Sequence, residues 1–472
     1  MSEVLHLYPD RFLGQTGEIR SVARRLFTEV ESLPIISPHG HTEPRWFADN
    51  KVFDNPTDLL IVPDHYIFRM LYSQGVSLES LRIPIAGNES KVGPLEAWGI
   101  FADYYYLFQG TPTRIWLDYV FYEVFGLRDV LSAKTAQQYY EKISHQLKMD
   151  ALRPRAILDR FNIEFLATTD GALDSLQSHQ NIARAGFGHR VVPTFRPDSV
   201  TDPDCPGFFD NVARLSEITG EEATTWHGYL SALKNRREFF KSHGATATDH
   251  GHPSAHTSDL SNIECQKLFA KCLRGDADAQ EKEYFRGQML TEMAAMSLDD
   301  GLVMQLHVGV SRNHNKQLFN RFGQDKGADI PIPMEFVEGL KPLLQRFGNE
   351  SSLSVILFTL DESTYSRELA PLAGHYPCLR LGPAWWFHDS PEGMMRYRQQ
   401  VSETAGFYNT VGFNDDTRAL FSIPARHDLA RRIDCQFLAG WVVQRRLSED
   451  QALLLAKDLA YRLPKDAYKV EQ

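Results

Sequence analysis

Short apolar runs alternate with helix-length amphipathic stretches over most of the chain. The runs are residues 35–36, 163–166, 190–195, 245–248, 302–308, 353–360, 379–381 and 409–413. Strands that alternate with helices form parallel sheets, and eight such units predict a (β/α)8 barrel. The sequence contains neither a G-x-G-x-x-G nor a Walker A motif, which disfavours the nucleotide-binding α/β folds.

Two segments fall outside this alternation. Residues 18–33 carry apolar side chains at helical spacing and predict an amphipathic helix before the first strand. Residues 54–147 contain no strand-like run and are rich in aromatic and helix-forming residues, which predicts a helical insertion whose aromatics form its own core. The expected division is a helix and first strand (1–53), an insertion (54–150) and the rest of the barrel (151–472).

Charge and cysteine usage exclude some classes of partner. The net charge is -11 and no basic stripe is present, which argues against nucleic acid but not against a small anion bound by a few arginines. The five cysteines are scattered and form no CxxC pair, as expected of a reduced, cytoplasmic protein. Neither a signal-peptide block nor a run long enough to cross a membrane is visible.

Polar residues follow every one of the eight predicted strands. The active site of such a barrel lies at the carboxyl ends of its strands. In chain order these ends carry His39-Gly40-His41, Thr169-Asp170, Arg196-Pro197-Asp198, Asp249-His250, His307 with Arg312, Asp361, Trp385-Trp386, and Asp415-Asp416-Thr417-Arg418. Polar groups at all eight ends favour a functional site over a structural coincidence.

The His-x-His motif predicts part of a metal site. Side chains two apart share one face of a strand, so His39 and His41 would point the same way, although two histidines in a surface loop would show the same pattern. Asp415 or Asp416 could supply a third ligand, and only one of these neighbours can face inward. The set would hold one divalent ion with positions left open.

Three arginines, Arg196, Arg312 and Arg418, would make the site cationic. An anionic substrate would offset the cost of burying them, and a carboxylate fits arginine in a bidentate manner. A salt bridge to Asp170, Asp198 or Asp249 remains the alternative for any one of them. The Trp385-Trp386 pair would either pack against a sugar ring or place one ring in the core and one at the rim.

Further segments complete a pattern that spans nearly the whole chain: Asp64-His65-Tyr66 with Arg69, Asp174-Ser175-Leu176, Met304-Gln305-Leu306-His307, and Arg426-His427 with Arg431-Arg432. Together with the strand-end motifs, in this order and at these gaps, they resemble uronate isomerase, a divergent family of the amidohydrolase superfamily. The resemblance implies a metal-binding (β/α)8 barrel of the amidohydrolase type with a helical insertion after strand one. It also implies interconversion of D-glucuronate with D-fructuronate, and of D-galacturonate with D-tagaturonate.

The resemblance also implies roles for individual residues. His39, His41 and Asp416 match the metal ligands, usually of zinc. Tyr66, His65, Asp416 and Arg418 match catalytic positions, and Arg196, Asp249, His307, Arg312 and Trp385 match substrate-binding positions. The pattern departs at Ser37-Pro38, where many relatives have Asp and Tyr, and this leaves the ligands intact. No lysine follows strand four, where the superfamily often carries a carbamylated one, which favours one metal over two.

Aldose–ketose isomerisation moves one proton from C2 to C1 and another between the two oxygens. The charge that develops on oxygen needs a cation already in place, either the metal or Arg418. Tyr66 and Asp416 are the candidate proton-transfer pair. Metal ligation would lower the basicity of Asp416 and so favours Tyr66 for the C–H step, if an arginine or the metal lowers the pKa of Tyr66. Arg196 or Arg312 would grip the C6 carboxylate.

The residues alone are also compatible with two other functions. A hydrolase or lactonase could use a metal-bound water on the same barrel. A sugar-acid binding protein would explain the arginines and tryptophans but not the pairing of His-x-His with a late aspartate. The expected partner is a hexuronate, with neither nucleic acid nor membrane, and exposed aromatics of the insertion could support a homo-oligomer.

Overall fold

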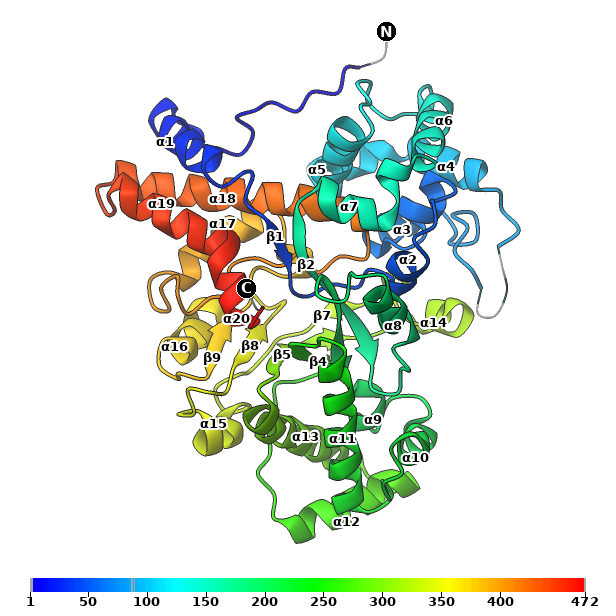
Figure 1. The fold of residues 1–472 in the computed structure, drawn as a ribbon, viewed down its shortest axis with the longest axis vertical. Coiled ribbons are helices and arrows are strands. Elements are labelled where there is room, and N and C mark those ends of the chain that lie inside the picture. The colour runs from blue at the N-terminus through cyan, green and yellow to red at the C-terminus, as the bar shows by residue number, and fades with distance from the viewer. Residues whose placement is uncertain (1–2, 86–87, 89, 471–472) are drawn as a thin grey trace.

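A parallel sheet lies at the centre of the computed structural model, which describes residues 3–85, 88 and 90–470. Its seven strands run in the order β1-β2-β3-β4-β5-β8-β9. They are β1 Ile35–Ser37, β2 Ile163–Gly171, β3 Val191–Arg196, β4 Ala247–His250, β5 Val303–His307, β8 Val355–Phe358 and β9 Leu379–Leu381. Figure 1 shows them gathered in the middle of the molecule, with helices outside. Seven predicted runs are therefore confirmed, with ends shifted by a few residues.

The eighth predicted run, residues 409–413, is not a full strand. It joins β9 through one parallel bridge between Thr410 and Leu381. Gly412 follows at φ +76°, a left-handed conformation that ends the extended chain. The next segment returns to the end of β1, where the His41 N–H donates to the Thr417 carbonyl at 3.0 Å. The fold is thus a curled parallel α/β barrel whose last strand is shortened to a bridge.

Helices cover the sheet and build the ends of the molecule. Their bounds are α1 Gly17–Thr28, α2 Pro44–Asp49, α3 His65–Tyr72, α4 Pro94–Asp103, α5 Pro112–Tyr119, α6 Ala136–Leu147, α7 Pro154–Arg160, α8 Gln177–Arg184, α9 Asp198–Thr201, α10 Phe208–Thr219, α11 Trp226–Ser242, α12 Asn262–Arg274, α13 Ala279–Asp300, α14 Lys316–Phe322, α15 Lys341–Phe347, α16 Ala370–Ala373, α17 Pro391–Val401, α18 Ile423–Val443, α19 Glu449–Lys457 and α20 Leu463–Ala467. Shorter helical turns connect several of them. The long helices begin at clear caps: Ser261 and Glu264 form a capping box on α12, and Thr225 caps α11.

Two local predictions need correction. The first helix ends at Thr28 rather than near residue 33, because the chain turns at residues 29–33 before Pro34 and β1. The predicted loop at 323–333 contains one strand of a small antiparallel hairpin, β6 Val310–Ser311 with β7 Ile330–Pro331. This hairpin follows β5 and carries charged side chains to the site.

Between β1 and β2 the described chain is mainly helical, and Figure 1 shows α3 to α7 grouped on one side of the sheet. Trp98, Phe101 and Tyr105 are buried in the core of this segment, which confirms that its aromatics are mostly core. Trp116 differs, since it packs into the core of the barrel. Residues 86–87 and 89 of the predicted insertion, and 1–2 and 471–472 at the ends, lie outside the described residues.

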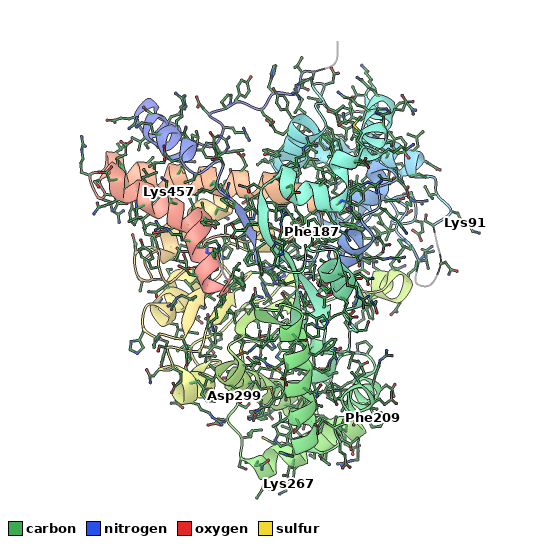
Figure 2. All side chains as sticks on the ribbon, in the orientation of Figure 1. Lys91, Phe187, Phe209, Lys267, Asp299 and Lys457 are labelled. Carbon is green, nitrogen blue, oxygen red and sulfur yellow. The ribbon has the colours of Figure 1, made fainter. Side chains whose placement is uncertain are left out.

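Several large apolar side chains are exposed on the surface of the described chain. Figure 2 places Phe209, which is 54% exposed, at the margin of the molecule near α10. Tyr106 of the insertion is exposed as well. None of the helices in the described ranges is long and apolar enough to cross a membrane.

The packing of α18 against α1 and α19 gives a stability prediction. Leu438 of α18 is fully buried between these helices, whereas Leu454 of α19 is largely exposed. Leu438→Ala should lower the free energy of unfolding by about 2–5 kcal/mol, because it leaves a cavity. Leu454→Ala should change it by less than about 0.5 kcal/mol. Urea titration measures both, and equal losses would contradict the packing described.

Candidate active site

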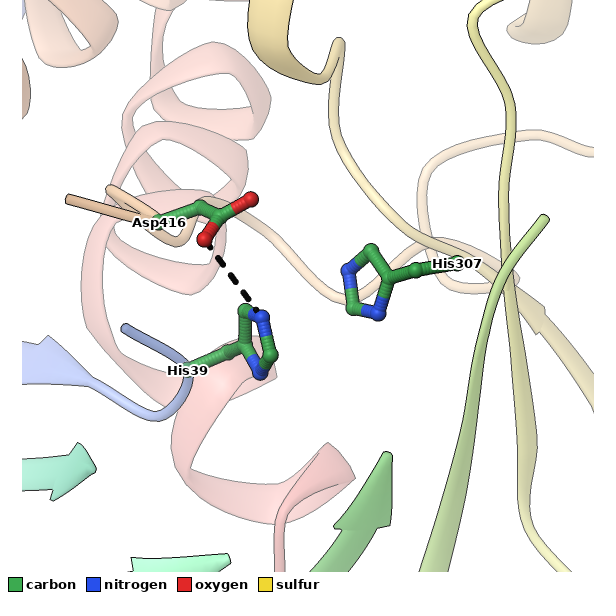
Figure 3. A group of neighbouring side chains, drawn as sticks. All are labelled: His39, His307 and Asp416. Atoms are coloured by element: carbon green, nitrogen blue, oxygen red, sulfur yellow. Dashed lines mark ion pairs between the residues drawn. The ribbon is translucent and has the colours of Figure 1, made fainter. Parts of the chain in front are cut away.

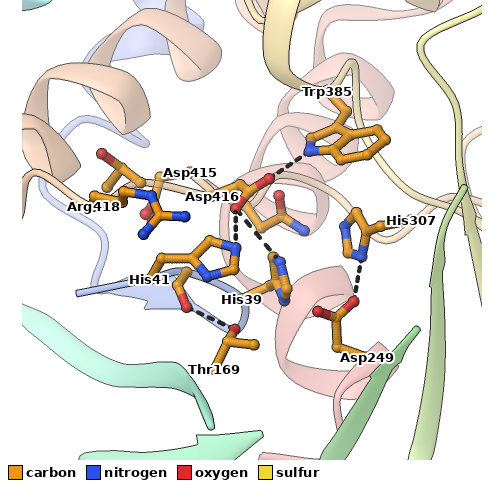
Figure 4. A network of polar contacts seen from close by, with 12 residues as sticks. His39, His41, Thr169, Asp249, His307, Trp385, Asp415, Asp416 and Arg418 are labelled. Atoms are coloured by element: carbon orange, nitrogen blue, oxygen red, sulfur yellow. Dashed lines mark hydrogen bonds and ion pairs between the residues drawn. The ribbon is translucent and has the colours of Figure 1, made fainter. Parts of the chain in front are cut away.

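Asp416 is the centre of the strand-end cluster. Its Oδ1 lies 3.2 Å from His41 Nε2 and 3.5 Å from His39 Nε2, and its Oδ2 accepts a hydrogen bond from Trp385 Nε1 (Figure 4). Burial opposes the charge, but the two histidines outweigh it and hold the Asp416 pKa well below its usual value. Asp416 has φ +39°, a strained conformation for a non-glycine residue of the kind found at functional sites.

The Asp415 side chain points toward α18, whereas Asp416 contacts His39 and His41. Its Oδ2 is 3.0 Å from His427 Nε2 of α18, and the side chain is buried. We expected the side chains of Asp415 and Asp416 to point in opposite directions, because neighbouring residues of a strand do so. The structure achieves it through a turn, since no strand forms here.

Arg196, Asp249 and His307 form a chain of polar contacts beside the Asp416 cluster. His307 Nδ1 lies 2.6 Å from Asp249 Oδ1, and Asp249 Oδ2 lies 3.0 Å from an Arg196 Nη1. Burial opposes the charge of Asp249, but Arg196 and His307 outweigh it and keep the Asp249 pKa well below its usual value. A Cβ on Gly251 would lie 2.2 Å from the Arg196 guanidinium, so a side chain here would have to displace that arginine from its present position. Arg196 also pairs with Asp198.

The donor set fits a divalent metal. Two ligands bound about 2.1 Å from a tetrahedral zinc ion lie about 3.4 Å apart, close to the distances from Asp416 to His39 and His41. His39, His307 and Asp416 also present ligand atoms within 4.8 Å of one another (Figure 3). His307 Nε2 is buried with no hydrogen-bond partner, while its Nδ1 is held by Asp249. His39 and Asp416 therefore belong to both possible sets, and His41 and His307 compete for the third place.

The other two arginines pair with the loop that follows β5. Arg312 Nη1 donates to Asp329 at 2.9 Å, and Arg418 lies 3.2 Å from Asp325. Both arginine side chains keep about a third of their surface exposed. The predicted alternative of a salt bridge to Asp198 or Asp249 is confirmed for Arg196, which pairs with both. Arg312 and Arg418 also form salt bridges, but with aspartates that the sequence did not suggest.

His65 and Tyr66 enter the site from the insertion. Asp64 caps α3 by accepting the Tyr66 N–H at 2.9 Å, which places His65 and Tyr66 in the first turn of that helix. Their rings stack, with centroids 5.1 Å apart. Burial lowers the pKa of His65 to about 3, so this ring is neutral.

The protein groups around Tyr66 raise its pKa, whereas a lowering by an arginine or the metal was expected. The Tyr66 hydroxyl donates to Asp389 Oδ2 at 3.1 Å. Burial and the Asp389 carboxylate raise the Tyr66 pKa well above its usual value, although Arg426 acts in the opposite direction. Tyr66 is therefore a neutral phenol whose proton is directed at a carboxylate.

The two rings of the Trp385-Trp386 pair have different environments, as the alternative of one core ring and one rim ring predicted. Trp385 is buried, donates to Asp416 and meets His307 edge to face at 4.8 Å. Trp386 is half-buried and lines the cavity beside His65. One ring belongs to the core and the other to the rim.

A cavity of about 1130 Å³ joins these groups. Its lining contains every predicted site residue except Asp249, which lies behind His307 and Arg196: His39, His41, His65, Tyr66, Arg196, His307, Arg312, Trp385, Asp416 and Arg418. Sequence reasoning missed Asp325, Asp329 and Asp389. The first two lie in a segment read only as a loop, and nothing in the sequence around Asp389 marked it.

The chain is thus a parallel α/β barrel that gathers histidines and an aspartate at the ends of its strands. A metal-dependent hydrolase from Lactobacillus casei shares this fold, with a TM-score of 0.55 at 15% identity over 94% of this chain and 97% of that one.

Closer relatives define the family. A family model described as glucuronate isomerase matches residues 8–468. Uronate isomerase of Xanthomonas axonopodis pv. citri is 59% identical over 99% of this chain and all of its own length. The crystal structure of glucuronate isomerase from Caulobacter crescentus has a TM-score of 0.98 at 56% identity, covering 100% of this chain and 98% of that one. That of uronate isomerase from Thermotoga maritima has a TM-score of 0.91 at 28% identity, covering 98% and 100%.

The chain belongs to the uronate (glucuronate) isomerase family. It is an isomerase that acts on small uronates.

The two kinds of arginine pairing give a test by substitution. Arg196→Met leaves the buried Asp249 carboxylate without its guanidinium partner, and should lower the free energy of unfolding by about 3–5 kcal/mol. Arg312→Met breaks a partly exposed pair and should cost about 1 kcal/mol or less. Chemical denaturation compares them, and equal losses would contradict the buried charge chain.

Proposed function

We propose that this isomerase interconverts D-glucuronate with D-fructuronate, and D-galacturonate with D-tagaturonate, through an enediol. The observation that carries the proposal is the single cavity in which an ionised Asp416, the Tyr66 hydroxyl and three arginines meet. The family membership supports uronate chemistry, and the arginines suit the C6 carboxylate.

His39, His41 and Asp416 are the proposed ligands of one divalent ion, with zinc the expected metal. Their spacing and their N and O donors suit it. When bound, the ion supplies positive charge that polarises the substrate oxygens. Asp249 fixes the ring orientation of His307, so that Nε2 faces the cavity as a substrate-binding group.

The three arginines are proposed to have different roles, because they differ in how far their guanidinium groups are already paired. The Arg196 Nε and one Nη are already used by Asp198 and Asp249. Arg312 has one carboxylate partner in the described chain and stays partly exposed, which favours Arg312 for the C6 carboxylate. Arg418, two residues after Asp416, is the cation proposed to stabilise the enediol oxygen.

Tyr66 and Asp416 are the proposed proton-transfer pair. Tyr66 takes the C2 proton and delivers it to C1. Asp416, ionised in its resting state, moves the O2 proton to O1. His65, neutral and stacked on Tyr66, holds the phenol toward the cavity, and Trp385 fixes the carboxylate of Asp416.

Three wider assignments are proposals as well. The division at residues 53–54 and 150–151 is supported by the aromatic core of the insertion. A cytoplasmic location is supported by five free cysteines. A homo-oligomer is supported only by the exposed aromatics of the insertion, such as Tyr106.

Product analysis tests the function. With zinc supplied, the protein should convert D-glucuronate to a ketose visible by NMR. Asp416→Asn should lower kcat by about 10²–10⁴-fold, because it removes a proton-transfer group. Asp415→Asn is the matched control and should retain most activity, since that side chain faces His427. Absence of ketose from the unmodified, zinc-supplied protein would contradict the proposal.

Metal analysis separates the two candidate third ligands. His41→Ala should weaken zinc binding by about 10-fold or more, whereas His307→Ala should keep the metal and lose activity. Zinc titration with a competing chelator measures this. Metal loss in His307→Ala with retention in His41→Ala would reassign the third ligand to His307.

A further inference from the structure

Behind Tyr66 lies a buried carboxylate that does not itself line the cavity and that the reaction described above does not use. Asp389 follows the turn Trp386–His388 and is 6% exposed. Its Oδ2 accepts both the Tyr66 hydroxyl, at 3.1 Å, and Nη1 of Arg426, at 2.7 Å. Its Oδ1 is buried and has no hydrogen-bond partner among the described residues.

We propose that Asp389 is a positioning residue that accepts the hydroxyl proton of Tyr66 while Tyr66 removes the C2 proton of the substrate, and that it later returns this proton. The proposal rests on the role given to Tyr66 above. It answers the difficulty that a neutral phenol cannot act as the base until its own proton has somewhere to go.

The exchange balances. As the C2–H bond breaks, its electron pair forms the C1=C2 bond of the enediol and the π pair of the C1=O bond moves onto O1. The C2 proton moves to the Tyr66 oxygen while the hydroxyl proton of Tyr66 moves to Asp389 Oδ2. In the second half, Tyr66 delivers a proton to C1, and Asp389 returns its proton to Tyr66. The O2 proton reaches O1 through Asp416. No net proton or electron is gained, so no further reactant is needed.

The surroundings suit a carboxylate that gains and loses a proton. Burial raises the pKa of Asp389 to about 7, although Arg426 of α18 and the Tyr66 hydroxyl of α3 act against it. Asp416 adds a further negative charge nearby. The Arg426 guanidinium lies 3.5 Å from the ring centroid of Trp116, which fixes the arginine and through it Asp389.

A second buried ion pair that involves α18 argues against a purely structural role for the pair between Asp389 and Arg426. Asp434 of α18 binds Arg398 with both carboxylate oxygens, at 2.6 and 2.9 Å. Asp389 instead uses one oxygen for both Arg426 and Tyr66 and leaves the other free. The geometry aims that one oxygen at the phenol.

The first variant is Asp389→Asn, which keeps a hydrogen-bond acceptor for Tyr66 but cannot take up a proton. We expect kcat to fall about 10²-fold or more, with little change in KM, because Asp389 does not line the cavity. In the unmodified enzyme kcat should fall as the pH drops through about 7, since Asp389 must be ionised to accept a proton. Asp389→Asn should lack this acid limb. Unchanged kcat and an unchanged acid limb would overturn the proposal.

Asp434→Asn is the matched control, because it also removes a buried carboxylate from an arginine. It should lower the melting temperature but leave kcat per folded molecule and the acid limb unchanged. Asp389→Glu should recover part of kcat and keep an acid limb with a displaced midpoint. If Asp389→Asn does not fold, this second variant decides, and an acid limb that stays in place would overturn the proposal.

Tyr66→Phe separates this proposal from the one on which it rests. In the Tyr66→Phe background, Asp389→Asn should cause no further loss of kcat, because its partner is gone. A further loss as large as in the unmodified enzyme would overturn the relay. Full activity of Tyr66→Phe alone would overturn the role of Tyr66, whereas a slow Tyr66→Phe beside a fully active Asp389→Asn would overturn only the role of Asp389.

Discussion

The convergence of His39, His41 and Trp385 on one carboxylate, Asp416, is the interaction on which the rest of the site depends. These residues come from the first strand end, the seventh strand end and the segment after the closing bridge, so they meet only when the sheet has curled fully. Burial would make an isolated carboxylate costly at this position. Three N–H or metal-directed partners offset that cost and fix both oxygens of Asp416.

Charge is arranged in two layers around this centre. The inner layer is the chain from Arg196 through the buried Asp249 to the buried His307, and it fixes the orientation of His307. The outer layer consists of Arg312 and Arg418, which are partly exposed and held by Asp329 and Asp325 on the loop after β5. Screened outer pairs can exchange partners at low cost, whereas the buried pairs cannot. An anionic substrate is therefore expected to meet the outer layer.

Much of the barrel could be predicted because buried parallel strands leave a direct mark in the sequence. Seven apolar runs became strands, and the predicted polar residues after five of them line one cavity. Asp249 after β4 lies behind the lining, and Asp361 after β8 is not part of it. The eighth run failed as a strand because Gly412 adopts a left-handed conformation after one bridge, and an apolar run carries no sign of that. The choice of Asp416 over Asp415 came from the family resemblance, and the geometry shows how a turn separates them.

The partners of the site residues were harder to predict, because they depend on which loops fold back across the cavity. Asp325 and Asp329 lie in a Gly-rich segment with no apolar pattern, and Asp389 belongs to a turn that only the packed α18 brings to Tyr66. The direction of the Tyr66 pKa shift depends in part on one of these partners, Asp389. A neighbouring cation was expected, but a carboxylate and burial dominate.

Anomalous diffraction at the zinc edge, from crystals grown with zinc and soaked with a hexuronate, tests the central claim most directly. The account predicts one zinc peak about 2.0–2.2 Å from Asp416 Oδ1 and the Nε2 atoms of His39 and His41, with the sugar acid in the same cavity. A zinc peak that does not involve Asp416, or a sugar acid bound elsewhere, would contradict it.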